Sequence, residues 1–192
     1  MIPTLTMIPN PNHDPNPDHD PNPTMKILDR IIAPLAEASE RDRSLLGIKC
    51  LLAPLVQLTA LIPIDRLTPF STALSKLAAG VSHGPAVEAV KAGVITTAAG
   101  ILGRLDPLVN NGVVASLLSV ISLSLVHVRA HDNTGKTCWA AGLEFVSSEP
   151  ALACLVRSLL LYNREQCPTS AIGAAMVSQA VLEAWLPSSL ES

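Results

Sequence analysis

One short stretch of the chain, Ala130–Thr137, has the residue types and the spacing of a phosphate-binding loop. It reads Ala-His-Asp-Asn-Thr-Gly-Lys-Thr, which fits the loose pattern of Gly or Ala, four residues, then Gly-Lys-Ser/Thr. In such a loop backbone amides surround the phosphates, Lys136 after Gly135 would contact the terminal ones, and the Thr137 hydroxyl would hold magnesium. An alternating strand over 120–128 and a helix over 137–147 would complete the setting. A small nucleotide-binding protein is therefore one hypothesis.

The surroundings of this loop favour a plainer interpretation. Ala130 replaces the usual first glycine, and no apolar run ending in Asp follows that could hold the metal. Only 55 of the 192 residues remain downstream for the rest of a parallel sheet. We therefore expect a polar loop between two helices, in which residues 132–135 turn the chain and Thr134 or Thr137 caps the next helix. This interpretation predicts no bound cofactor.

A second pattern, Gly80-Val-Ser-His-Gly84, matches the Gly-x-Ser-x-Gly elbow that presents a nucleophilic serine in α/β-hydrolases. Asp106 and His127 even follow in the chain order of that catalytic triad. The elbow requires a strand before the serine, whereas residues 74–79 have helical spacing, and no glycine-rich oxyanion segment is present. The glycines are explained as a helix end at Gly80 and a helix start at Gly84. No catalytic residue is predicted.

Histidines and cysteines give a weak indication of a metal site. His127 and His131 stand four residues apart, with Asp132 and Cys138 nearby, but no second pair of ligands accompanies them. We therefore predict no metal site. The cysteines lie too far apart for a disulfide framework and contain no Cys-x-x-Cys pair, which indicates reduced, mostly buried thiols in an intracellular protein: Cys50, Cys138, Cys154 and Cys167.

The first 24 residues differ in composition from the rest. They hold seven of the sixteen prolines, three aspartates and no Lys or Arg, in a repeat of Pro-Asn-Pro-Asn-His-Asp type. Because proline at every second or third position prevents both helix and sheet, the sequence predicts a disordered tail over 1–24. The remaining residues carry thirteen acidic and thirteen basic side chains, so the net charge of −3 belongs to the tail.

The stretch 107–128 contains no charged residue and is long enough to cross a bilayer. Asn110 and Asn111 near one end and four serines along it leave no unbroken apolar run of that length. A helix buried inside the protein is therefore favoured over a membrane segment, which stays open as an alternative.

Hydrophobic residues over the rest of the chain recur at helical spacing, which predicts an all-α protein. The expected core includes Phe145, both tryptophans (Trp139 and Trp185) and Met176. Eight helices are expected, at 25–39, 42–62, 67–79, 85–102, 107–128, 136–147, 149–163 and from 168 to 187.

Two apolar segments resemble each other: Ile31–Ala36 is echoed by Leu51–Val56, each with a central proline. Pro34 and Pro54 should therefore mark kinks or helix starts. Short amphipathic helices, small residues and few aromatics are typical of stacked helical hairpins. In this pattern the segment 25–187 resembles the armadillo and HEAT family of helical-repeat solenoids, which implies stacked antiparallel hairpins.

These observations predict a disordered tail over 1–24, one helical domain over 25–187 and a short tail over 188–192. The resemblance implies a non-enzymatic scaffold or adaptor that presents a groove to a partner helix or peptide. Basic residues alternate with acidic ones, as at 40–43, so nucleic acid is not an expected partner. The sequence indicates neither a small-molecule substrate nor a secretory signal, and we expect the protein in the cytoplasm or nucleus.

Overall fold

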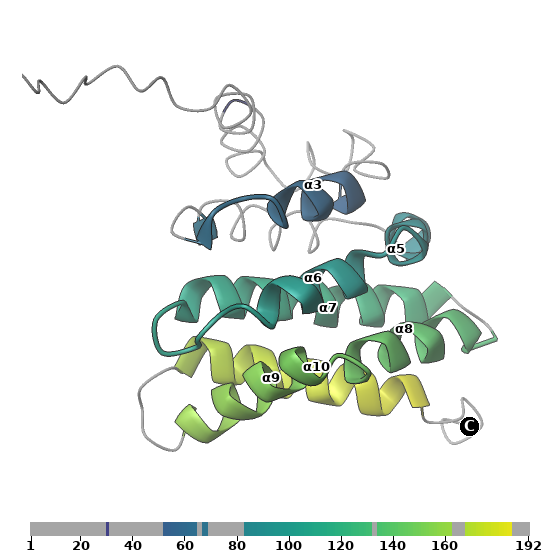
Figure 1. The fold of residues 1–192 in the computed structure, drawn as a ribbon. Helices are drawn as coiled ribbons and strands as arrows, with labels where there is room; N and C mark the ends of the chain where they lie inside the picture. Colours follow the sequence, from purple (N-terminus) through teal and green to yellow (C-terminus); the bar gives the residue numbers. More distant parts are fainter. Residues whose placement is uncertain are drawn as a thin grey trace, which may run out of the picture.

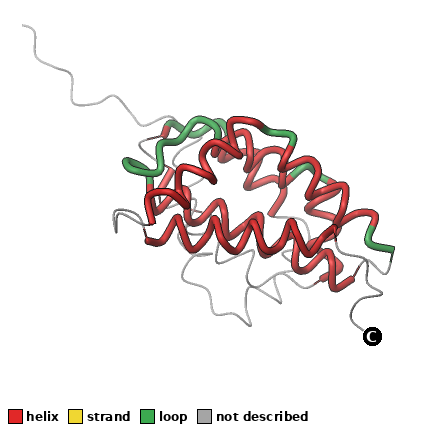
Figure 2. The backbone as a smooth tube through the Cα atoms, turned by 90° about the horizontal axis from the view of Figure 1, so that it is seen from below, coloured by secondary structure: helices red, strands yellow, loops and turns green. Residues whose placement is uncertain are grey.

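The chain forms an all-α fold in the computed structural model (Figure 1). The structure describes residues 30, 52–64, 67–68, 83–131, 134–162 and 168–185. Within these ranges 83% of the residues are helical and there is no strand, which confirms the predicted fold class (Figure 2). The described helices are α3 (Leu52–Thr59), α5 (His83–Lys91), α6 (Val94–Leu102), α7 (Asn111–His131), α8 (Lys136–Val146), α9 (Glu149–Tyr162) and α10 (Pro168–Trp185).

Several predictions concern residues outside these ranges. The tails at 1–24 and 188–192, all but residue 30 of the expected helix over 25–39 and most of the one over 67–79 lie outside the described residues. The repeated segment around Pro34 also lies outside them, so only its counterpart at Pro54 is placed.

Prolines stand in the first turn of four described helices. Pro54 is the third residue of α3, Pro85 the third of α5, Pro150 the second of α9 and Pro168 the first of α10. The first four amide groups of a helix have no partner within the helix, so a proline there removes no hydrogen bond. The prediction that Pro54 marks a kink or a helix start is confirmed, as a start.

The single helix predicted over 85–102 is wrong, because the chain breaks it into α5 and α6. Gly93 lies between them with φ of 84° and ψ of 25°, in the left-handed region that favours glycine. Its amide donates to the Val90 carbonyl (2.9 Å), and its own carbonyl accepts from Thr97 (3.0 Å). The buried stripe passes from Val90 to Val94 with helical spacing, so hydrophobic pattern alone gives no sign of the break.

Helix α7 runs through the middle of the bundle and packs against α5, α6, α8 and α10 (Figure 1). It begins four residues later than predicted, because residues 106–110 form a turn. There the Asp106 carboxylate accepts from the Leu108 amide (3.0 Å), and the Asp106 carbonyl accepts from the Asn110 amide (2.8 Å). In the part of the chain that the structure describes, α7 is the one helix with the length and apolar composition to cross a membrane. About half of that apolar stretch, 56%, is buried inside the bundle.

Helices α7 and α10 lie side by side and run in the same direction. At their N-terminal ends the Asn111 amide group accepts from the Ser170 backbone (3.0 Å) and donates to the Thr169 hydroxyl (3.2 Å). At their C-terminal ends Arg129 pairs with Glu183 (2.9 Å). Thr169 and Ser170, near the start of α10, are residue types that commonly cap a helix from its own segment. In the structure the side chain of Asn111 on α7 instead accepts a hydrogen bond from the Ser170 amide in the first turn of α10.

Candidate interaction surface

The phosphate-loop pattern lies between two helices in the structure. The strand that the nucleotide-binding hypothesis requires over 120–128 is not formed, since these residues belong to α7. Gly135 has φ of 66° and precedes the first residue of α8, and the Lys136 amide donates to the Thr134 hydroxyl (3.4 Å). Lys136 itself is exposed. The geometry is that of a polar turn before a helix, and the strand that positions a phosphate loop is missing from the described residues around it.

The described residues of the hydrolase pattern do not come together in a catalytic site. Residues 80–82 lie outside the described ranges, and His83 and Gly84 open α5. Asp106 precedes the start of α7, whereas His127 lies near its end, about 24 Å further along the helix axis from Asn111 at 1.5 Å per residue. A triad needs its acid and its base within hydrogen-bond reach, so this pair does not form one.

The histidine and cysteine candidates also stay apart. His127 and His131 lie one turn apart on α7, and the thiol of buried Cys138 on α8 donates to the Leu125 carbonyl (3.6 Å). Among the described residues no three His, Cys, Asp or Glu side chains converge as metal ligands would. Cys138 and Cys154 are free and buried, as predicted for these two; Cys50 and Cys167 lie outside the described ranges.

Cys154 is held in its protonated form by its surroundings. Burial, together with the nearby Asp106 charge, raises the pKa of its thiol from 9.0 to about 11, although Arg157 acts in the opposite direction. Because the thiolate is the nucleophile, we expect iodoacetamide at pH 8 to leave Cys154 unmodified in the native protein and to modify it after unfolding in urea. Peptide mass spectrometry measures both states, and rapid modification of the native thiol would contradict the packing around α9.

The same thiol should make stability depend on alkaline pH. Above about pH 9 the unfolded thiol loses its proton, whereas the folded thiol keeps it until about pH 11. The contribution of Cys154 to the free energy of unfolding is therefore complete below pH 9 and is lost as the pH rises through 11. In Cys154→Ala the free energy of unfolding should therefore fall less between pH 8 and pH 11 than in the wild type. Urea denaturation over this pH range measures the difference.

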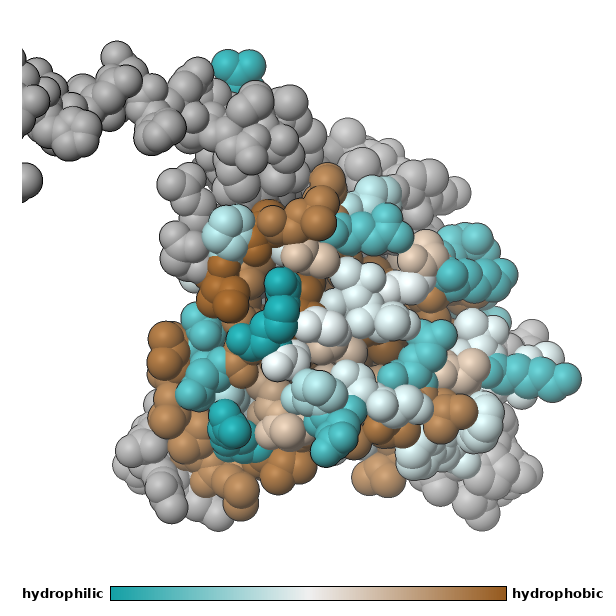
Figure 3. Space-filling view, in the orientation of Figure 1, coloured by the Kyte–Doolittle hydropathy of each residue, from teal (hydrophilic) through white to brown (hydrophobic). Residues whose placement is uncertain are grey.

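The most distinctive feature of the described surface is apolar and follows α10. Figure 3 shows the side on which α9 lies in front of α10, and hydrophobic residues gather at its lower left, near the end of α9. Ile172 is 56% exposed and Met176 44%, with Leu182 further along the same helix also exposed. On α9, Val156 and Leu160 are exposed as well.

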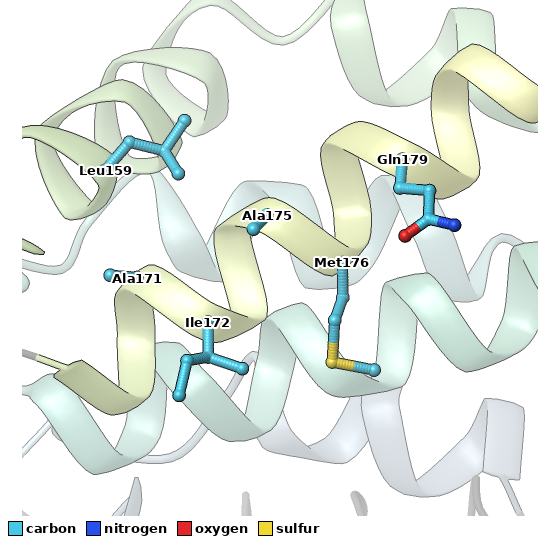
Figure 4. Close-up of a pocket in the computed structure, with 6 residues that line it drawn as sticks. All are labelled: Leu159, Ala171, Ile172, Ala175, Met176 and Gln179. Atoms are coloured by element: carbon cyan, nitrogen blue, oxygen red, sulfur yellow. The ribbon is translucent and has the colours of Figure 1, made fainter.

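A hollow of about 400 Å³ lies between α9 and α10. In Figure 4, Ile172 and Met176 extend from the same side of α10, and Leu159 on α9 lies across from them. A smaller hollow of about 130 Å³ lies on the other side, toward Leu123 and Val126 of α7, and shares Met176 and Gln179 with the first. We call the lining of the larger hollow the α10 face: Leu159, Ala171, Ile172, Ala175, Met176 and Gln179.

The α10 face carries no charge, and the charges beside it neutralise each other. Gln179, its one polar side chain, donates from Nε2 to Glu183 Oε1 (2.7 Å). The other oxygen of Glu183 accepts from Arg129 (2.9 Å). Both carboxylate oxygens of Glu183 are thus engaged, and a group that docks on the face meets an apolar surface with a single amide in it.

Three residues expected in the core are exposed instead. Met176, Trp139 and Trp185 are each between 42% and 52% exposed, whereas Phe145 is buried as predicted. For Met176 and Trp185 the error has a physical source, because α10 is apolar on nearly all sides and its pattern does not define which side is buried. The α10 face was missed for the same reason. A sequence signal did exist, since Ile172, Met176 and Gln179 recur at i, i+4 and i+7 opposite Val177 and Val181.

Comparison of the chain with protein-family models, with curated proteins and with solved structures found no match.

Proposed function

We propose that this protein is a non-enzymatic interaction scaffold or adaptor, and that the α10 face binds an amphipathic helix or peptide of a partner protein. The observation that carries the proposal is the hollow of about 400 Å³, lined almost entirely by apolar side chains on a surface that faces outward. Large apolar side chains exposed side by side lower the free energy when a partner removes them from water.

The shape of the α10 face suits a helix as the bound element. From Ile172 to Gln179 it extends over about two turns, with its apolar residues at the spacing that packs against another helix. Ile172 and Met176 form a ridge, and the hollow toward Leu159 on α9 can receive one or two large side chains. Methionine adapts its shape to different partners, which favours a recognition role for Met176.

Charge defines the chemistry of the partner. Since the α10 face is uncharged, a charged side chain buried against it would lose its hydration without gaining an ion pair. The partner helix should therefore present Leu, Ile, Val, Met or Phe at i, i+3/i+4 and i+7, with its charged residues on the opposite side.

The helical-repeat arrangement belongs to the same proposal, as does a cytoplasmic or nuclear location. Support for stacked hairpins over 25–187 comes from the short connections: two residues separate α5 from α6, and two separate α8 from α9. A stack of this kind exposes long helix faces on one side, which is how such proteins bind extended partners.

The test is a selection of helical peptides. A display library of amphipathic helices is selected on the full chain and counter-selected on Met176→Lys, whose long side chain can keep its charge in water without disturbing the core. We expect helices with an apolar i, i+3/i+4, i+7 stripe to be enriched. Val109→Lys is the matched control, because Val109 is 79% exposed in the loop before α7, outside the α10 face. Failure to enrich any helix over an unrelated bait would contradict the proposal.

A further inference from the structure

The α10 face has properties that make it complementary to itself. We propose that its partner is a second copy of this chain, so that two α10 helices pack against each other across a two-fold axis. This inference rests on the proposed function, since it names the partner of the same surface. In a two-fold interface the same patch serves both subunits, and every contact is made twice.

Ridge and hollow alternate on this one surface. Ile172 and Met176 project from α10, and the hollow of about 400 Å³ lies directly beside them toward Leu159. When two copies meet through this surface, the ridge of each copy can pack into the hollow of the other. Ala175, between these residues, leaves room for the two helix backbones to approach closely.

The amide of Gln179, which lies in the same apolar surface, also suits pairing with its own copy. One Nε2 hydrogen is donated to Glu183 Oε1, so the other hydrogen and the Oε1 oxygen remain to be used by a partner. An amide is both donor and acceptor, and therefore two copies of Gln179 facing each other can form a reciprocal pair of hydrogen bonds. A single polar residue within an apolar helix contact fixes the register and the number of chains.

Charge permits this pairing and disfavours a lipid surface. The α10 face brings no like charges together when it meets itself, and residues 25–192 carry equal numbers of acidic and basic side chains, so the two copies do not repel each other. A membrane would need basic residues to attract anionic headgroups, and α10 contains no Lys or Arg. Burial of Gln179 in hydrocarbon would also leave part of its amide without a partner.

The test uses sedimentation velocity of the full chain over a concentration series. We expect a reversible dimer, at least tenfold weaker in Met176→Lys and unchanged in Val109→Lys. Circular dichroism of each variant confirms that its helix content is retained. A chain that stays monomeric at all concentrations, or a dimer that Met176→Lys does not weaken, would overturn the proposal.

A charge-exchange pair tests the two-fold axis itself. Gln179→Lys and Gln179→Glu should each be monomeric, because each places like charges opposite each other, and their equimolar mixture should form a heterodimer. Only contact of residue 179 with its own copy predicts this rescue, so a mixture that stays monomeric contradicts the axis. If the wild-type chain is monomeric but still binds selected helices, self-pairing is wrong and the proposed function stands. Flotation of a monomer with neutral phosphatidylcholine vesicles, lost in Met176→Lys, would identify lipid as the occupant and also overturn the proposal.

Discussion

Replacement of Gly173 by leucine is expected to lower the free energy of unfolding by about 3 kcal/mol, because the side chain must enter the contact between α10 and α7. A Cβ atom at Gly173 would lie 3.1 Å from Leu118 Cβ and 3.4 Å from the Ala115 carbonyl oxygen. The first distance is tighter than ordinary packing and the second is at the limit of ordinary van der Waals contact, and a leucine adds three further carbons in the same space. Helices α7 and α10 can accommodate the leucine only by moving apart. This movement would loosen the most extensive contact that α7 makes.

The matched control is Gly100, a second glycine inside a helix. Gly100 is exposed on α6, and a Cβ there would meet nothing within 4 Å. Gly100→Ala should therefore raise the free energy of unfolding by about 0.5 to 1 kcal/mol through helix propensity alone. Urea denaturation followed by circular dichroism measures both variants. Equal effects at the two positions would mean that α7 and α10 are not packed as described.

Truncation of Phe145 to alanine should cost about 3 to 5 kcal/mol, the usual range for removal of a buried phenylalanine. Phe145 on α8 is only 1% exposed and is among the largest fully buried side chains of the described residues. Its ring contributes to the core shared by α8 and the helices that pack on it, α6, α7, α9 and α10. Removal leaves a cavity that short helices joined by tight turns can fill only in part.

Leu143, on the same helix, is the comparison for Phe145. It is 41% exposed, so Leu143→Ala removes less area from the folded interior and should cost about 1 kcal/mol or less. The difference between the two variants in thermal and urea unfolding reports which side of α8 faces the core. A larger loss for Leu143→Ala than for Phe145→Ala would contradict the orientation of this helix.

The sequence predicted the helix class and several helix spans because those depend on local spacing. The predicted segments 136–147 and 149–163 differ by one residue at their ends from α8 and α9. Pro150 and Pro168 stand in the first turns of α9 and α10, where a proline is tolerated. Phe145, which was predicted to lie in the core, is buried.

The features that the sequence did not predict depend on contacts between distant segments. The cap of α10 comes from Asn111, which stands 59 residues before Ser170. Exposure of Met176 and Trp185 follows from which side of α10 meets α7, and nearly uniform apolar residues leave that side undefined. The break at Gly93 requires a left-handed glycine whose neighbours continue the hydrophobic stripe. The α10 face combines five residues of α10 with Leu159 of α9, so the pattern of α10 alone does not indicate the hollow between the two helices.

Binding of partner helices by the α10 face can be measured directly. The quantity is the dissociation constant of one selected helix for the wild type, Met176→Lys and Val109→Lys, by fluorescence anisotropy. If the α10 face is the binding surface, we expect at least tenfold weaker binding for Met176→Lys, about 1.4 kcal/mol, and an unchanged constant for Val109→Lys. Equal affinity of all three proteins would contradict this role of the α10 face.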